Sequence, residues 1–309
     1  GQMRNRGIDF AIGYRGSLGS DIGWNVNFNG AHYRNRIVRI DGEQEFFFGP
    51  ITTRTATQGV TINQVGDPIG SFYGLEVSGI FQTQAEIDAL NAAARAATGD
   101  PAAVYQANAA PGRFRFADVD GDGVVTAADR TIIGSPHPDF TAGLNLGLDW
   151  RRWDFGATLF GTFGNEIFDV QKEFYVFRVF PTNVRRDLLT DSWTGPETPN
   201  AKYPRLDAND VFSSAPSSFY VEDGSYVRLR SLQVGYTVPE SWVRGFGNVR
   251  VYVRGENLFT ITGYDGLDPS LPALSATAAG MDVRDQARGI DRGVYPTNRT
   301  LSVGFGLGF

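Results

Sequence analysis

The sequence predicts an all-β fold, namely an antiparallel transmembrane β-barrel portion of about seven spanning strands with long extracellular loops and one short loop helix. Three observations predict it. Apolar and polar residues alternate with period two, short and long connections follow one another in turn, and four of the five tryptophans lie beside short connections. Alternation alone also fits a soluble β-sandwich, but a sandwich has no reason to place every long connection at one end.

Each predicted strand has one apolar and one polar face. In the first strand Ile8, Phe10 and Ile12 alternate with Asp9 and Ala11, and the other strands repeat this pattern. About ten residues at ~3.3 Å each, tilted near 45°, cross the ~25 Å apolar band of an outer membrane. The predicted strands cover residues 6–16, 21–33, 139–150, 153–164, 226–238, 248–260 and 298–309.

The connections give the strands a direction. The long connections, 34–138, 165–225 and 261–297, are predicted to be extracellular loops, because barrels of this kind have short periplasmic turns. Bacterial single-chain barrels have even strand counts, so seven strands indicate that residues 1–309 are the C-terminal part of a larger barrel. An aromatic girdle at the short-turn end is predicted from Trp24, Trp150, Trp153 and Trp242.

The first long connection contains the predicted helix, at 85–97. It is rich in Ala and carries Ile87 and Leu90 as apolar positions. Thr83 is its expected N-cap, with Glu86 three residues later as the partner in a capping box.

Composition excludes several functional classes. The chain has no Cys and only two His, which argues against disulfide scaffolds, zinc ribbons and His-driven catalysis. A net charge of −6 argues against nucleic acid as a partner. No arrangement of Ser, His and Asp with the context of a hydrolase motif is present, so the chain is predicted not to be an enzyme.

Residues 118–129 have the spacing of a twelve-residue calcium loop. Gly123 permits the sharp turn that lets carboxylates at alternate positions converge on a hard cation. An acidic turn that binds nothing is the alternative. The expected role is structural, with calcium pinning a long external loop. The candidate ligands are Asp118, Asp120, Asp122, the Val124 carbonyl, Thr126 and Asp129.

Side chains of the second long connection are further candidates for contacts. Tyr175, Phe177, Phe180 and Trp193 are suited to stacking on sugar rings, but packing within the loop itself is the favoured interpretation. Four arginines are candidates for contact with acidic lipopolysaccharide groups or for lining the lumen: Arg185, Arg186, Arg228 and Arg230.

Four stretches resemble the C-terminal part of SusC/RagA-type TonB-dependent outer-membrane transporters. They run from Ile69 to Gln82, from Asp118 to Phe140, from Asn257 to Pro269 and from Tyr295 to Phe309. The terminal Phe309, preceded by apolar residues at every second position, also resembles the signal that the barrel-assembly machinery recognises.

This resemblance implies a barrel of about 22 strands with an N-terminal plug, in the outer membrane of a Gram-negative bacterium. It also implies a SusD-like lipoprotein as a lid, energy from TonB through parts of the receptor outside this chain, outer-membrane lipid as surroundings, and an oligosaccharide or peptide as cargo. The alternative from the residues themselves is a secreted calcium-binding β-sandwich that binds glycans. A β-rich glycosidase is a third and weaker hypothesis.

Overall fold

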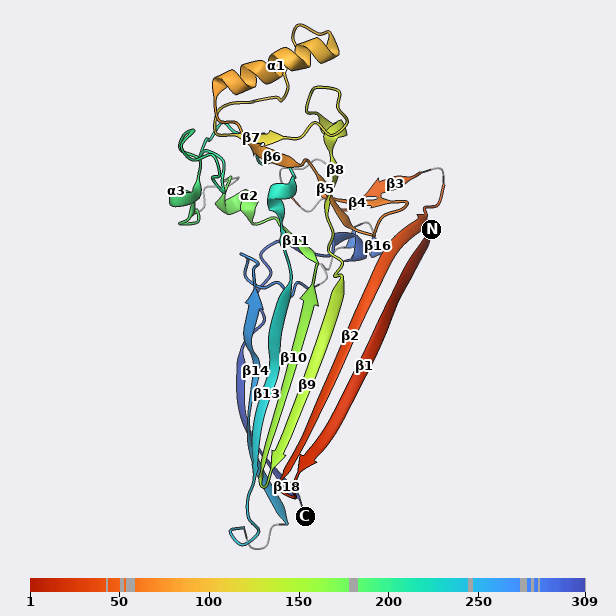
Figure 1. The fold of residues 1–309 in the computed structure, drawn as a ribbon, viewed down its shortest axis with the longest axis vertical. Helices are drawn as coiled ribbons and strands as arrows, with labels where there is room; N and C mark the ends of the chain where they lie inside the picture. Colours follow the sequence, from red (N-terminus) through yellow and green to blue (C-terminus); the bar gives the residue numbers. More distant parts are fainter. Residues whose placement is uncertain are drawn as a thin grey trace.

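One curved antiparallel sheet carries a layer of long connections at one end (Figure 1). The computed structural model describes residues 1–42, 44–50, 53, 59–177, 183–243, 247–272, 277–278, 281–282 and 284–308. Its seven-stranded sheet has the order β1-β2-β9-β10-β13-β14-β18, so each strand pairs with the next long strand of the chain. The strands are β1 (Gln2–Leu18), β2 (Ile22–Arg39), β9 (Phe140–Trp150), β10 (Trp153–Phe163), β13 (Tyr226–Thr237), β14 (Asn248–Thr262) and β18 (Thr300–Gly308).

All seven predicted strands are present, and the first two are longer than predicted. β1 and β2 stay paired above the apolar stretch, where Asn5 lies opposite Asn35, and β2 ends only at Arg39. The first long connection therefore begins at residue 40 rather than 34. The reason is that ladder hydrogen bonds do not require apolar side chains, whereas the sequence pattern detects only those. Phe309 lies outside the described residues.

The short and long connections lie at opposite ends of the sheet (Figure 1). The turns after β1, β9 and β13 are at one end, and the three long connections are at the other. We call residues 40–139, 164–225 and 263–299 the loop layer. With an odd number of strands, the N-terminus lies beside the loop layer and the C-terminus at the short-turn end.

The apolar residues form continuous rows on one face of the sheet, which we call the apolar face. No second sheet within the described ranges covers it, and Ile8, Val303 and Phe305 are 72%, 82% and 73% exposed. These rows therefore do not meet each other in a dry interior, so the β-sandwich alternative is not supported. One row crosses all seven strands through Tyr14, Val26, Leu146, Ala157, Leu232, Gly255 and Leu301.

On the opposite face, which we call the polar face, the side chains of the adjacent row are small or hydrophilic. Residues paired across neighbouring strands point to the same face, so the alternation along each strand gives the sheet one apolar and one polar surface. The row runs through Gly13, Asn27, Asn145, Thr158, Ser231, Glu256 and Thr300.

The hydrophobic core lies in the loop layer. Buried rings of Phe72, Phe168 and Tyr220 form one cluster, and Phe114, Phe116 and Trp193 belong to a second. Short strands frame these clusters: β3 (Phe46–Phe48), β4 (Thr61–Gln64), β5 (Ser71–Gly74), β6 (Val77–Ile80), β7 (Phe114–Phe116), β8 (Thr131–Gly134), β11 (Glu166–Asp169), β12 (Val221–Asp223), β15 (Thr277–Ala278), β16 (Met281–Asp282) and β17 (Ile290–Asp291).

The predicted helix is α1 (Gln84–Thr98). Thr83 caps it by accepting a hydrogen bond from the Glu86 amide at 3.2 Å, as predicted. The Glu86 carboxylate accepts from the Gln82 amide at 2.8 Å, one residue before the position that a capping box requires. Two single-turn helices, α2 (Lys172–Tyr175) and α3 (Leu188–Asp191), were not predicted. Among the described residues, no helix has the length and apolar character needed to cross a membrane.

The assignment of the two faces predicts opposite outcomes for neighbouring substitutions. In the full-length protein, Leu146→Arg on the apolar face should lower the free energy of unfolding by about 2–4 kcal/mol, because the predicted barrel places this face against lipid, where a charge near the midplane is desolvated. Asn145→Arg on the polar face should change it by less than about 1 kcal/mol. Urea unfolding in lipid vesicles, followed by tryptophan fluorescence, measures both. Equal costs would contradict the assignment.

Candidate functional site

The polar face is built so that side chains lie flat against the strands. Arg250 on β14 and Asp154 on β10 form an ion pair across the intervening strand, with Nη2 2.5 Å from Oδ1 and Nε 2.9 Å from Oδ2. Gly235 of β13 lies beneath this pair. A Cβ there would come within 2.2 Å of the Asp154 carboxylate, so the glycine is what permits the bridge.

Asparagines of β2 use glycines of β9 in the same way. A Cβ on Gly147 would lie 2.3 Å from the Asn25 amide, and one on Gly143 would lie 2.4 Å from that of Asn29. These amides therefore cover the strand beside them instead of projecting from it. The result is a smooth, hydrogen-bonding surface suited to a wet interior and to polar contents.

The predicted calcium loop brings three of its carboxylates together. Ligand atoms of Asp118, Asp120 and Asp129 all lie within 4.8 Å of one another. Gly123 makes the turn at φ 93°, and the loop lies against α1 so closely that a Cβ on Gly123 would be 2.8 Å from that of Ala97. Asp129 is fully buried, although its carboxylate oxygens also accept hydrogen bonds from the amides of Val119 and Thr126, both at 2.7 Å.

The remaining predicted ligands are engaged locally. Asp122 accepts a hydrogen bond from the Val124 amide at 2.9 Å. Thr126 is the N-cap of the 3₁₀ turn Ala127–Asp129, and its hydroxyl accepts from the Ala128 amide at 3.1 Å. The structure thus brings together three of the four predicted carboxylates, from the first, third and last positions of the loop.

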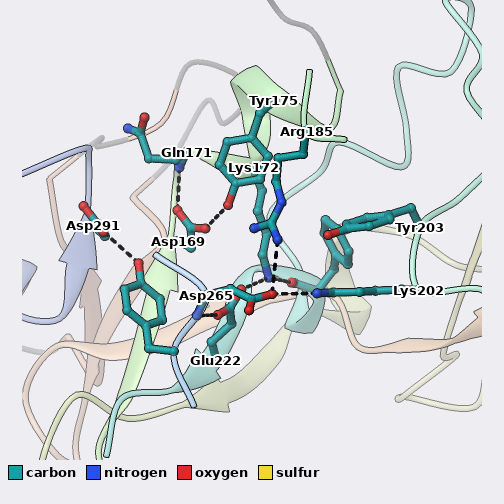
Figure 2. Close-up of polar contacts among 12 residues, drawn as sticks. Asp169, Gln171, Lys172, Tyr175, Arg185, Lys202, Tyr203, Glu222, Asp265 and Asp291 are labelled. Atoms are coloured by element: carbon teal, nitrogen blue, oxygen red, sulfur yellow. Dashed lines mark hydrogen bonds and ion pairs between the residues drawn. The ribbon is translucent and has the colours of Figure 1, made fainter. Parts of the chain in front are cut away.

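A network of charged side chains joins the second and third long connections (Figure 2). Lys172 pairs with Glu222 at 2.7 Å, and both side chains are largely buried. Glu222 in turn accepts a hydrogen bond from the Asp265 amide at 3.0 Å. The Asp265 carboxylate pairs with Lys202 at 2.6 Å and with Arg185 at 3.6 Å.

Two buried aspartates lie side by side at one end of this network. Asp169 of β11 and Asp291 of β17 are register partners in a parallel pair, exposed by 1% and 2%. Tyr175 donates its hydroxyl proton to Asp169, and Tyr264 donates to Asp291 at 2.7 Å. Burial raises the pKa of Asp169 to about 6, although its hydrogen bond from Tyr175 acts in the opposite direction. Burial and the neighbouring carboxylates raise the pKa of Tyr175 and of Tyr264 well above the ordinary value for tyrosine, so both hydroxyls stay protonated.

A second buried ion pair fastens the third long connection to the sheet. Arg228 of β13 contacts Asp268 at 2.5 Å, with side-chain exposures of 7% and 9%. Asp268 also accepts hydrogen bonds from the amides of Thr297 and Ser270, at 2.9 and 2.8 Å. Burial alone would raise the pKa of Asp268, but these amides and the Arg228 guanidinium together lower it below its ordinary value.

The aromatic candidates of the second connection are internal. Phe177 packs against all three described core clusters. Trp193 is 7% exposed and donates its indole N–H to Gln82 at 2.9 Å. Tyr175 is also engaged within the loop layer, where its hydroxyl donates a hydrogen bond to Asp169, so these three side chains agree with the favoured interpretation of packing within the loop. Phe180 lies outside the described residues.

The sequence did not single out Asp169, Lys172, Glu222 and Asp265 as a network. Asp265, like Asp268, lay in one of the stretches that carry the family resemblance, but no role was assigned to it. No spacing rule was available for Asp169, Lys172 and Glu222, because the second connection brings them together only when it folds.

Known proteins resemble the chain over its whole length, although no protein-family model matches it. It is 31% identical to TonB-dependent receptor P3 of Formosa agariphila over 313 residues, covering 100% of the chain and 29% of that receptor. It is 24% identical to TonB-dependent receptor SusC of Bacteroides thetaiotaomicron, covering 100% of the chain and 27% of SusC. A solved structure of the RagAB peptide transporter has a similar fold, with a TM-score of 0.72 and 22% identity. The match covers 99% of the present chain and 29% of the matched transporter chain.

The chain thus spans less than a third of the relatives that it matches. These relatives and the solved structure are named as receptors and a transporter, which agrees with the prediction that the chain is not an enzyme.

Asp169 should make the loop layer sensitive to pH. Its folded pKa of about 6 lies above that of an unfolded aspartate, about 4, so the folded state binds the proton more tightly. Stability should therefore fall as pH rises from about 4 through 6. Infrared difference titration should show a protonated carboxyl band with a midpoint near 6 that Asp169→Asn removes. Asp265→Asn, at a carboxyl whose pKa Lys202 lowers, is the control and should leave the band.

Removing Asp268 should loosen the third connection. Asp268→Ala leaves the Arg228 guanidinium buried and unpaired, which should cost about 3–5 kcal/mol of local stability. Hydrogen exchange at the amides of Thr297 and Ser270 measures the loss. Glu256→Ala, which breaks the half-exposed pair with Arg254, should cost less than about 1 kcal/mol. A cost for Asp268→Ala no larger than this control would show that the buried pair does not hold the connection.

Proposed function

Because the chain is a SusC-like portion of a TonB-dependent receptor, we propose that it forms one side of an outer-membrane importer for a nutrient oligosaccharide or peptide. The sheet contributes the last strands of a barrel of about 22 strands, and the loop layer contributes its extracellular surface. TonB energises transport through parts of the receptor outside this chain, and a SusD-like lipoprotein covers the loop layer.

The single observation that carries this proposal is the two-faced sheet. Its apolar rows are exposed or half-buried on all seven strands, while the only large cores in the described part of the chain lie in the loop layer. An apolar surface of this extent on a protein in water would drive association. Against lipid it is the favourable arrangement, and the polar face then lines an aqueous lumen.

The free edges of the sheet support the same proposal. Among the strands that the structure describes, β1 and β18 each pair on one side only, and β1 has 17 residues. Backbone groups have no water to bind in the bilayer core, so both edges must pair with further strands to close a barrel. The named relatives are more than three times as long as this chain, which is ample for those strands.

The packed loop layer supports an extracellular binding role. Its connections have their own aromatic cores and two buried ion-paired links, Lys172–Glu222 and Arg228–Asp268, so they hold a defined shape above the lumen. A defined surface is what a lid lipoprotein and a cargo need for specific contact. The similar RagAB structures are titled as those of a peptide importer, which favours peptide as the first cargo to test.

The acidic loop has a structural part in this proposal. Calcium held by Asp118, Asp120 and Asp129 would fix the turn against α1 and stiffen the first connection. The convergence of the three carboxylates supports it. A weak site, with Kd of about 10⁻⁴–10⁻³ M, suffices outside the cell.

Import is tested by growth and uptake. Cells lacking the receptor should lose growth on one class of nutrient, peptides or oligosaccharides, as sole carbon source. The full-length gene should restore growth, and removal of TonB should abolish it again. Uptake of a labelled cargo that persists without the receptor or without TonB would overturn the proposal.

Calcium binding is tested by calorimetry on the full-length receptor after chelation. Calcium at millimolar concentration should release or absorb heat, and Asp120→Ala should remove at least one binding event, because Asp120 is one of the three convergent carboxylates. Asp88→Ala, at an exposed acidic position on α1, is the control and should bind as the unaltered receptor does. The absence of heat, or equal heat in both variants, would remove the calcium site.

A further inference from the structure

Four arginines form a patch at the N-terminal end of β1 and the C-terminal end of β2. Register places Arg4 directly opposite Arg36, and Arg6 directly opposite Arg34. All four are exposed. We call them the arginine patch. It was not among the arginines that the sequence pointed to.

The arginine patch has no counter-charge in the described part of the chain. None of its four guanidinium groups forms an ion pair or hydrogen bond with a described residue. Like charges directly opposite each other destabilise a strand pair. Two such pairs in succession are therefore a cost that a bound anion would offset.

Several arginines elsewhere in the described part of the chain are paired with carboxylates. On the polar face Arg250 pairs with Asp154, and Arg254 pairs with Glu256. Arg185 of the loop layer pairs with Asp187, and Arg228 of β13 pairs with Asp268. Two of the arginines that the sequence suggested for lipopolysaccharide contact are thus engaged within the protein.

The arginine patch lies on the apolar face. In β1 the even-numbered positions continue from Arg4 and Arg6 to Ile8, Phe10 and Ile12, and side chains at every second position share a face. From Ile8 to Leu18 is ten residues, which at ~3.3 Å each and a tilt near 45° gives a height of about 23 Å. The patch therefore begins where one apolar band ends.

The orientation of the sheet indicates which leaflet of the membrane lies at this end of the apolar band. The aromatic pairs Tyr14–Trp24 and Trp153–Tyr236 lie at the short-turn end, and the arginine patch lies at the loop-layer end. If the loop layer is extracellular, the patch is at the headgroup level of the outer leaflet.

We propose that the arginine patch binds the phosphate groups of an anionic glycolipid in the outer leaflet. Guanidinium groups match phosphate oxygens with paired hydrogen bonds. The acyl chains of such a lipid would lie along Ile8 and Phe10, directly below the charges. This continuity of charged and apolar surface favours a lipid over a free anion. The inference depends on the membrane orientation of the sheet and not on which nutrient is imported.

Native mass spectrometry of the full-length receptor in mild detergent tests this inference. The probe is lipid A carrying both phosphates, and the variant is Arg6→Gln with Arg34→Gln. Each basic side chain near an anionic surface contributes about fivefold to attachment, so the double variant should bind about 25-fold more weakly. Lipid A without phosphates should bind the receptor and the variant equally weakly.

Arg15→Gln is the matched control, because Arg15 is an exposed arginine of β1 on the polar face. It should bind phosphorylated lipid A as the unaltered receptor does. If the double variant does not fold, as judged by its migration in unheated gels, Arg34→Gln alone should show a loss of about fivefold. Equal binding by variant and receptor, equal binding of both lipids, or displacement of the lipid by millimolar inorganic phosphate would each overturn the proposal.

Discussion

The structure depends on the pairing of backbone hydrogen bonds along seven long strands. Those bonds are satisfied between neighbours, so the side chains of the strands are free to make two unlike surfaces. A sheet of this kind does not need a hydrophobic core of its own where lipid covers the apolar face. The cores of the described chain accordingly lie in the loop layer, which must hold its shape in water.

Glycine has a specific use on the polar face. Gly235 leaves room for the ion pair between Asp154 and Arg250, and Gly143 leaves room for the amide of Asn29. These glycines of the sheet therefore make room for polar side chains that lie flat on the polar face. The loop layer uses the opposite solution. There, Asp268 is buried and paired with Arg228 of β13, which fastens the third long connection to the sheet.

The strands were largely predictable because period two repeats over about ten residues in each, and a one-residue slip would expose the wrong face to lipid. The start of β1 and the end of β2 could not be predicted. Residues before Ile8 and after Tyr33 no longer show the apolar alternation, although the hydrogen-bonded pairing of β1 with β2 continues there. In the candidate metal loop, spacing identified Asp118, Asp120 and Asp129, which do converge. It could not show that Asp122, the fourth carboxylate, lies outside this group.

Alternation along a strand is a local property, so the all-β class, the two-faced strands and the residues that share a face could all be predicted from the amino-acid sequence. The folded chain was needed to show which residues far apart in the sequence meet. Asp169 lies beside Asp291, Lys172 pairs with Glu222, and Arg6 lies opposite Arg34. The physical reason is that register and loop packing depend on the sum of many distant contacts, and no short stretch of sequence contains both partners of any of these pairs.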